Sequence, residues 1–183
     1  MNLLYWTLLG AASWTLLEHL IHDYLGHRGR GRNPFGREHV KHHATTSYFA
    51  PAWKKALVAG PVVLMSCGLF ASVLGGRAGF AYASGLSVMY LAYEIVHRRR
   101  HTRAPLGAYG RFLRRHHFHH HFHDPRVNLG VTTPLWDWVF GTYEKAGLIM
   151  VPQRQAMDWL IEPFLGGIPP AFADDYELRP TAH

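Results

Sequence analysis

Long apolar runs alternate along this chain with short blocks that are dense in arginine and histidine. Three of these runs are long enough to predict membrane helices, because a helix needs about 20 apolar residues to cross a bilayer. They cover residues 1–21, 56–76 and 78–93, and the third extends to residue 96 around Glu94. The second and third runs meet at residues 75–77, which predicts a tight helical hairpin.

The positions of the basic residues set the expected orientation. Residues 28–55 carry seven Lys or Arg and one acid, and residues 98–115 carry seven Arg and no acid, whereas the hairpin tip carries only Arg77. Because basic segments next to spans favour the cytoplasmic side, we expect an integral membrane protein with both basic segments on the cytoplasmic face. The net charge of +7 does not indicate nucleic-acid binding, since the basic residues interleave with histidines and apolar runs.

The remaining segments are too short or too polar to span a bilayer. Residues 111–123 predict a helix on the cytoplasmic surface, and the aromatic-rich residues 132–143 are expected at the membrane interface. The expected fold class is all-α: an integral membrane helical bundle of about three to four membrane helices with a cytoplasmic helical cap that carries a histidine-rich dimetal site. Residues 1–145 are expected to form the membrane-embedded part, and residues 146–183 an irregular C-terminal cap or tail of the same domain.

Fourteen of the fifteen histidines fall into four groups, at residues 18–27, 39–43, 97–101 and 116–123. Residues three and four apart share one face of a helix, so His97 and His101 form a chelating pair. Each H-x-x-H-H string likewise predicts three nitrogens on one helical turn. His22 and His27 are five residues apart, about 140° around an ideal helix, so either they bind different ions or the helix ends near Gly26.

Pair and triplet thus occur twice on the same predicted membrane face, and about ten neutral imidazoles suit two metal ions. Without metal such a cluster is hard to explain, because protonated neighbours repel and buried unpaired nitrogens are costly. In the last group the spacing fits His116, His119 and His120 as well as His117, His120 and His121. Imidazole suits iron, zinc, copper and nickel alike, so ligand type does not identify the metal.

Acidic side chains are expected to orient some of the ligating rings. Glu18 lies four residues before His22, and Glu94 lies three residues before His97. Asp137 is a weaker candidate for the same role. For each of these acids, a charge pair with a nearby arginine is an equally good interpretation.

Four strings together resemble the fatty acid hydroxylase/sterol desaturase superfamily of membrane di-iron enzymes, and its fatty acid 2-hydroxylase branch most. They are LEHLIHDYLGH, REHVKHH, YEIVHRRRH and RRHHFHHHF, the last followed by NLGVTTPLWDWVFGTY, and the resemblance covers about residues 10–145. It places the last triplet just ahead of Phe122, and His19 stands where the family often has an aromatic, which suggests an accessory role. The metal ligands that the resemblance implies are His22, His27, His39, His42, His43, His97, His101, His117, His120 and His121.

The resemblance also implies a reaction. Two iron ions, which zinc can replace in purified material, would use oxygen to hydroxylate a fatty acid or fatty acyl chain, with the histidines acting as ligands and not as acid–base catalysts. Electrons would come from a separate donor such as a b-type cytochrome or a ferredoxin. A carotenoid or sterol hydroxylase or desaturase is the nearest alternative. A histidine-rich metal-binding or transport protein is the non-enzyme alternative, and the lack of carboxylates in residues 56–76 counts against transport.

Overall fold

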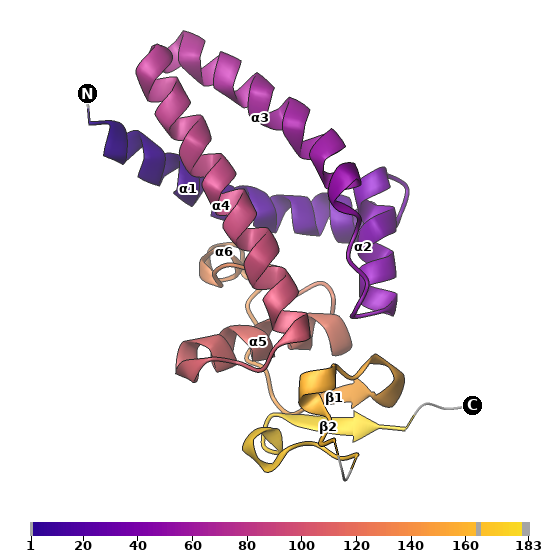
Figure 1. The fold of residues 1–183 in the computed structure, drawn as a ribbon. Helices are drawn as coiled ribbons and strands as arrows, with labels where there is room; N and C mark the ends of the chain where they lie inside the picture. Colours follow the sequence, from indigo (N-terminus) through magenta and orange to yellow (C-terminus); the bar gives the residue numbers. More distant parts are fainter. Residues whose placement is uncertain (1, 164–165, 181–183) are drawn as a thin grey trace. The chain divides into compact units, whose positions relative to one another are not determined.

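The computed structural model describes residues 2–163 and 166–180, which are predominantly helical. The chain divides into two compact units, residues 1–18 with 50–95 and residues 19–49 with 96–183, and each is described by itself. Figure 1 shows the helices in order: α1 Leu3–Leu20, the π-helix η1 Ile21–Arg28, α2 Pro34–Ala44, α3 Ala52–Leu74, α4 Gly76–Thr102, α5 Gly107–Phe122 and α6 Leu135–Phe140. The C-terminal part adds strand β1 Ile149–Pro152, the short 3-10 helices Gln153–Gln155, Asp158–Leu160 and Pro170–Phe172, and strand β2 Tyr176–Arg179.

The first unit contains the predicted hairpin. α3 ends at Leu74 and α4 begins at Gly76, so a single residue joins them. That residue, Gly75, has a φ of 86°, a conformation that glycine adopts without steric cost. Among the described residues, α3 is the one helix that is long and apolar enough to cross a membrane. α1 and α4 occupy the other two predicted runs, and their placement in a membrane stays a prediction.

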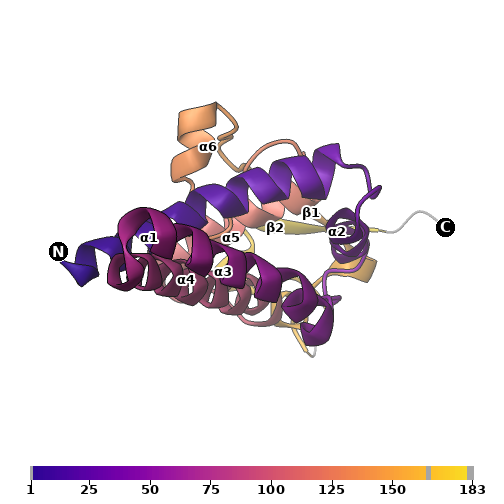
Figure 2. The same ribbon diagram turned by 90° about the horizontal axis from the view of Figure 1, so that it is seen from above.

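Glycines let the helices of the first unit approach closely. α1 crosses α4 (Figure 2), and a Cβ atom on Gly10 would lie 2.0 Å from the carbonyl oxygen of Tyr82. A Cβ atom on Gly85 of α4 would lie 1.9 Å from the carbonyl oxygen of Thr7. The two backbones therefore touch at points where any side chain would clash. Small residues at helix crossings are typical of membrane helices.

Large apolar side chains of the first unit point outward. None of the residues of α3 is buried within the molecule, although the helix is almost wholly apolar. Exposed apolar side chains also line α1 and α4, and those at least 60% exposed on the three helices are Leu4, Leu8, Trp53, Leu57, Leu64, Met65, Val73, Phe80 and Val88. An apolar exterior over a glycine-packed interior is suited to a lipid environment.

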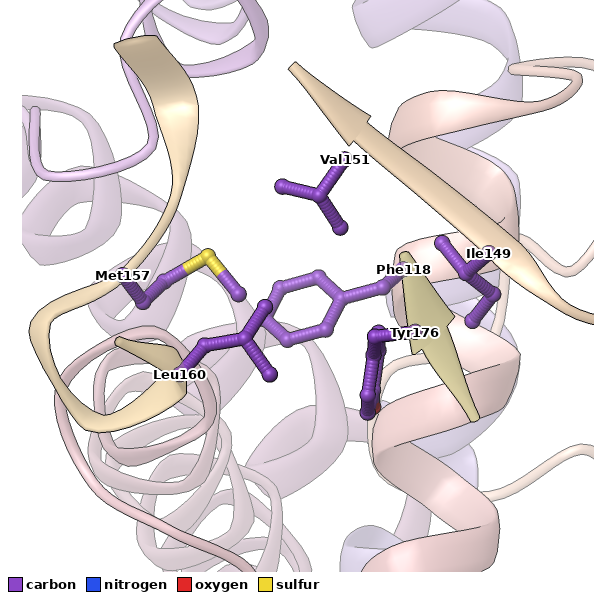
Figure 3. Packing of buried hydrophobic residues seen from close by; sticks show 6 residues of the cluster. All are labelled: Phe118, Ile149, Val151, Met157, Leu160 and Tyr176. Atoms are coloured by element: carbon purple, nitrogen blue, oxygen red, sulfur yellow. The ribbon is translucent and has the colours of Figure 1, made fainter. Parts of the chain in front are cut away.

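The second unit holds a small sheet that the all-α prediction missed. β1 and β2 pair in parallel, with Ile149 opposite Tyr176. Two strands of four residues are too short to show a period-2 pattern that stands out from an irregular tail. Both strands contribute to a buried cluster around Phe118 of α5, which Figure 3 shows: Phe118, Ile149, Val151, Met157, Leu160 and Tyr176. The C-terminal segment therefore anchors α5, the helix that carries most of the last histidine group.

Candidate metal centre

Ten histidines of the second unit gather into two groups of five. Within each group, one ring nitrogen of every member lies within 4.8 Å of those of all the others. The first histidine group consists of His22, His27, His39, His43 and His120, and the second consists of His42, His97, His101, His117 and His121. These are the ten residues that the sequence nominated. The structure brings all of them together, and their role as ligands stays a prediction.

The helix that carries His22 and His27 is a π-helix, which corrects the sequence-based expectation for this pair. Both belong to the first histidine group, and their ring centroids are 5.1 Å apart. η1 does not end near Gly26 but continues to Arg28. In a π-helix the backbone bonds join residues five apart, so positions i and i+5 come onto one face. The 140° separation applies only to an α-helix.

Each H-x-x-H-H triplet lies on one helix, as predicted, but its three histidines are divided between the two groups. On α2, His39 and His43 belong to the first group and His42 to the second. On α5, His117 and His121 belong to the second group and His120 to the first. Residues four apart share a face, whereas adjacent residues point about 100° apart. The rings of His43 and His121 stack at 4.1 Å where the two groups meet.

The nitrogen positions fit bound metal. In the first group, Nε2 of His39 lies 3.1 Å from Nε2 of His22 and 2.9 Å from that of His27. In the second group, Nε2 of His101 lies 2.8 Å from that of His117. Nitrogens about 2.1 Å from one ion and at right angles to each other are separated by about 3 Å. Both ring nitrogens of His121 are buried and have no hydrogen-bond partner among the described residues. Leaving a buried nitrogen unpaired costs free energy, and coordination of a metal ion would remove this cost for one of the two nitrogens.

Backbone carbonyls orient three of the rings. Nδ1 of His22 donates to the carbonyl of Leu129 at 2.6 Å, and Nδ1 of His120 donates to that of Val127 at 2.8 Å. Nδ1 of His42 donates to the carbonyl of Tyr48 at 2.8 Å. Because a carbonyl oxygen only accepts hydrogen bonds, Nδ1 must carry the proton and Nε2 presents its lone pair to the group. The sequence predicted carboxylates in this role and missed the carbonyls.

Asp137 belongs to neither histidine group, but it holds a backbone segment that contacts the first group. Its carboxylate is fully buried and accepts hydrogen bonds from the backbone N–H groups of Leu129 and Gly130, at 2.8 and 2.9 Å. It also accepts from the Thr142 hydroxyl at 2.7 Å and from Nε2 of His116 at 3.0 Å. Burial raises the pKa of Asp137, but these hydrogen bonds, that of His116 foremost, bring it below its ordinary value. Asp137 thus fixes the segment whose Leu129 carbonyl holds His22.

The remaining residues that the sequence predicted as partners of the ligands are His19, Glu18 and Glu94. His19 lies outside both histidine groups, with Nδ1 3.6 Å from an oxygen of Asp137 and its ring stacked on Phe140. Glu18 and Glu94 belong to the first unit, where Glu18 is buried and Glu94 forms an ion pair with Lys55. The charge-pair interpretation therefore applies to Glu94, with a lysine in place of an arginine. An orienting role for Glu18 or Glu94 stays a prediction.

The chain is similar to known proteins over most of its length. The sequence model of the fatty acid hydroxylase family matches residues 7–142, well over half of the chain. The chain belongs to the fatty acid hydroxylase family. This membership confirms the resemblance seen in the four histidine strings, and the matched range includes all ten nominated ligands.

Several fatty acid hydroxylases are similar over the same region. Ceramide very long chain fatty acid hydroxylase scs7 of Schizosaccharomyces pombe is 32% identical, covering 74% of this chain and 41% of that protein. Fatty acid 2-hydroxylase of Homo sapiens is 29% identical, covering 74% and 38%. A structure of full-length scs7p, with only the hydroxylase domain visible, has a TM-score of 0.65 and 25% identity over 79% of this chain and 58% of that one. The chain spans about two fifths of the length of these curated relatives.

Burial lowers the pKa of nine of the ten histidines in the two groups of this member of the fatty acid hydroxylase family. Burial, with repulsion from His27, lowers the pKa of His22 to about 3, and burial lowers that of His27 to about 4. Burial and repulsion between neighbouring rings place the pKa of seven other members well below the ordinary value: His39, His43, His97, His101, His117, His120 and His121. Neutral imidazole is the form that binds metal.

The lowered pKa values predict that the metal-free protein loses stability in mild acid. In the unfolded chain a histidine takes up a proton as the pH falls through 6.5, whereas folded His22 and His27 remain neutral down to about 3 and 4. The unfolded state therefore binds more protons, and each such histidine removes about 1.4 kcal/mol of stability for each pH unit below 6.5. We expect the unfolding midpoint of metal-free protein in detergent to fall steeply between pH 7 and 5. An unchanged unfolding midpoint would contradict the conclusion that buried His22 and His27 stay neutral in the folded protein.

Gly26 gives a second prediction for this site. A Cβ atom there would lie 3.0 Å from Cδ2 of His39 and 3.3 Å from its Nε2. Gly26→Ala should therefore displace the His39 ring by a few tenths of an ångström and weaken metal binding by the first group about tenfold, the scale of losing an outer partner. Gly110→Ala on α5 is the matched control, because its Cβ would meet nothing within 4 Å. Dialysis against a graded chelator measures the difference, and equal metal retention in both variants would refute it.

Proposed function

We propose that this protein is a membrane-bound di-iron oxygenase that hydroxylates a fatty acid or fatty acyl chain. The proposal rests on the two groups of five histidines in a chain of the fatty acid hydroxylase family. Each H-x-x-H-H triplet contributes histidines to both groups. The relatives are named as hydroxylases of ceramide very long chain fatty acids and of fatty acids. Hydroxylation consumes O2, two electrons and two protons, and yields the alcohol and water.

Iron is the proposed metal because hydroxylation needs a redox-active ion, and zinc has no redox chemistry. Two irons bound by the histidine groups would supply the oxidising power that inserts oxygen into a C–H bond. Zinc in purified material would be a replacement, since imidazole sites bind zinc more tightly than ferrous iron.

The protein's own residues prepare this chemistry in three ways. The carbonyls of Leu129, Val127 and Tyr48 hold protons on Nδ1, so that the Nε2 atoms of their histidines face the groups. Burial keeps the rings neutral and limits the access of water. Arg114 caps α4 by donating to the carbonyls of Arg99 and Arg100. It thereby secures the helix end that carries His97 and His101.

The membrane setting is part of the proposal. The exposed apolar surface of α3 supports a lipid environment, and we propose three to four membrane helices in all, with the histidine site on the cytoplasmic face beside the two basic segments. A lipid substrate would enter from the bilayer. Residues 1–145 would form the hydroxylase part and residues 146–183 its cap, a division supported by the packing of the C-terminal strands on α5. Electrons would come from a separate b-type cytochrome or ferredoxin.

The direct test is to express the protein with added iron and measure metal content together with hydroxylated lipids. The matched control is the double variant His42→Ala with His120→Ala, which removes one member from each histidine group. We expect two irons per chain, and a hydroxyl on the acyl chain of lipids that is missing in the control. Comparing free fatty acids with acyl chains released from ceramides identifies the substrate form. Less than one metal per chain and identical lipids in both samples would refute the proposal.

A further inference from the structure

A third group of potential ligands lies outside both histidine groups, on α5 and the segment after α6. It consists of His119, His123 and Glu144, whose ligand atoms all lie within 4.8 Å of one another. Nε2 of His119 is 3.6 Å from Oε1 of Glu144, and Nε2 of His123 is 4.0 Å from the same oxygen. The two rings, four residues apart, have centroids separated by 4.4 Å.

We propose that His119, His123 and Glu144 form a third metal site, which binds a divalent cation of the zinc type. Two imidazoles and one carboxylate are a donor set that zinc takes in proteins, with remaining positions left to water. The carboxylate is too far from both nitrogens to form a hydrogen bond, so the three groups are spaced for a common partner between them. One ion would satisfy all three at once.

Burial favours an ion over a solvated ion pair. His119 is only 5% exposed, and its Nε2 is buried without a hydrogen-bond partner among the described residues. An unsatisfied buried nitrogen is costly, and coordination removes that cost. The side chains of His123 and Glu144 are 64% and 48% exposed, so an ion can reach the site from solvent. The third site is therefore open and exchangeable, unlike the two buried histidine groups.

Glu144 is held in place by Asn128, which links the third site to the first histidine group. The Asn128 side chain donates to the carbonyl of Glu144 at 2.9 Å and accepts from its N–H at 2.8 Å. Asn128 is buried with a φ of 56°, and its chain neighbours are Val127 and Leu129. The carbonyls of those neighbours orient His120 and His22. A cation at the third site would thus stabilise the segment that positions the first histidine group.

Zinc stoichiometry tests the proposal without any measurement of hydroxylation. Protein whose two histidine groups are already loaded is dialysed against micromolar zinc, and zinc bound per chain is counted for wild type, His123→Ala and Glu144→Gln. We expect one more zinc in wild type than in His123→Ala, weaker binding in Glu144→Gln, and a wild-type count in the control Glu177→Gln, an exposed acid on β2. The extra zinc should also raise the thermal midpoint of wild type but not that of His123→Ala.

The difference between variants keeps this result separate from the proposed function. His123 is largely exposed, so its replacement does not endanger folding, and cobalt absorption reports occupancy in Glu144→Gln independently. Equal zinc counts in wild type and His123→Ala overturn the third site, whatever the two histidine groups contain. An extra zinc in wild type supports it even if no lipid is hydroxylated.

Discussion

Replacing His42 with alanine should remove one of the two proposed metal ions and abolish the proposed hydroxylation, while the ion bound by the group of its neighbour His43 is retained. The reason is the division of each triplet: His42 belongs to the second histidine group, whereas His39 and His43 belong to the first. Losing an outer partner typically reduces activity about 10- to 100-fold, and losing a ligand should reduce it further. Metal content per chain should fall from two to about one, as measured by elemental analysis.

Double variants make this prediction specific. His39→Ala with His43→Ala removes two members of one group, so about one metal per chain should remain. His39→Ala with His42→Ala removes one member of each group, so both metals should be weakened or lost. The two variants delete the same number of histidines from the same helix and are matched controls for each other. Equal metal content in the two would contradict the divided triplet.

Replacing Asp137 with asparagine should have the largest effect of any change outside the histidine groups. The carboxylate is 0% exposed and accepts from the N–H groups of Leu129 and Gly130, from Thr142 and from His116. An amide in its place turns one acceptor into a donor that faces other donors. Hydrogen bonds to charged groups contribute about 1.5–3 kcal/mol each, so we expect a loss of stability of about 2–3 kcal/mol.

The same variant should lose activity because Leu129 no longer holds His22 firmly. A 10- to 100-fold loss is expected, with weaker metal retention by the first histidine group than by the second. A purely structural role would lower the thermal midpoint and leave metal affinity equal in both groups. Asp158→Asn is the control, since that residue is exposed on a short 3-10 helix. Wild-type metal retention and activity in Asp137→Asn would refute the positioning role.

Side-chain type and spacing were enough to nominate the histidines, but not to divide them. The ten residues follow from ligand-type spacing and a family resemblance, since His97 and His101 sit on one helix face wherever that helix lies. The division of the triplets depends on how α2 and α5 face each other, which no local pattern records. The π-helix was missed for a related reason. The sequence from His22 to His27 does not reveal whether its backbone hydrogen bonds join residues four or five apart.

The long helices were predictable because a long apolar run is typical of a membrane helix. The bounds of α3 lie within four residues of those predicted. The contacts that orient the rings were not predictable. Backbone carbonyls do this for His22, His42 and His120, and every residue type has a carbonyl. The small C-terminal sheet was not predicted either, because its strands are stabilised by packing against Phe118, which is distant in the sequence.

The divided triplets also constrain the order of biosynthesis. Seven of the ten histidines precede residue 102, yet the first group needs His120 and the second needs His117 and His121. Since the chain emerges from the ribosome N-terminal end first, neither group can be complete until α5 has been made. The nascent chain therefore carries seven of these ten imidazoles before either histidine group is complete. Synthesis of α5 is thus the step that completes both histidine groups.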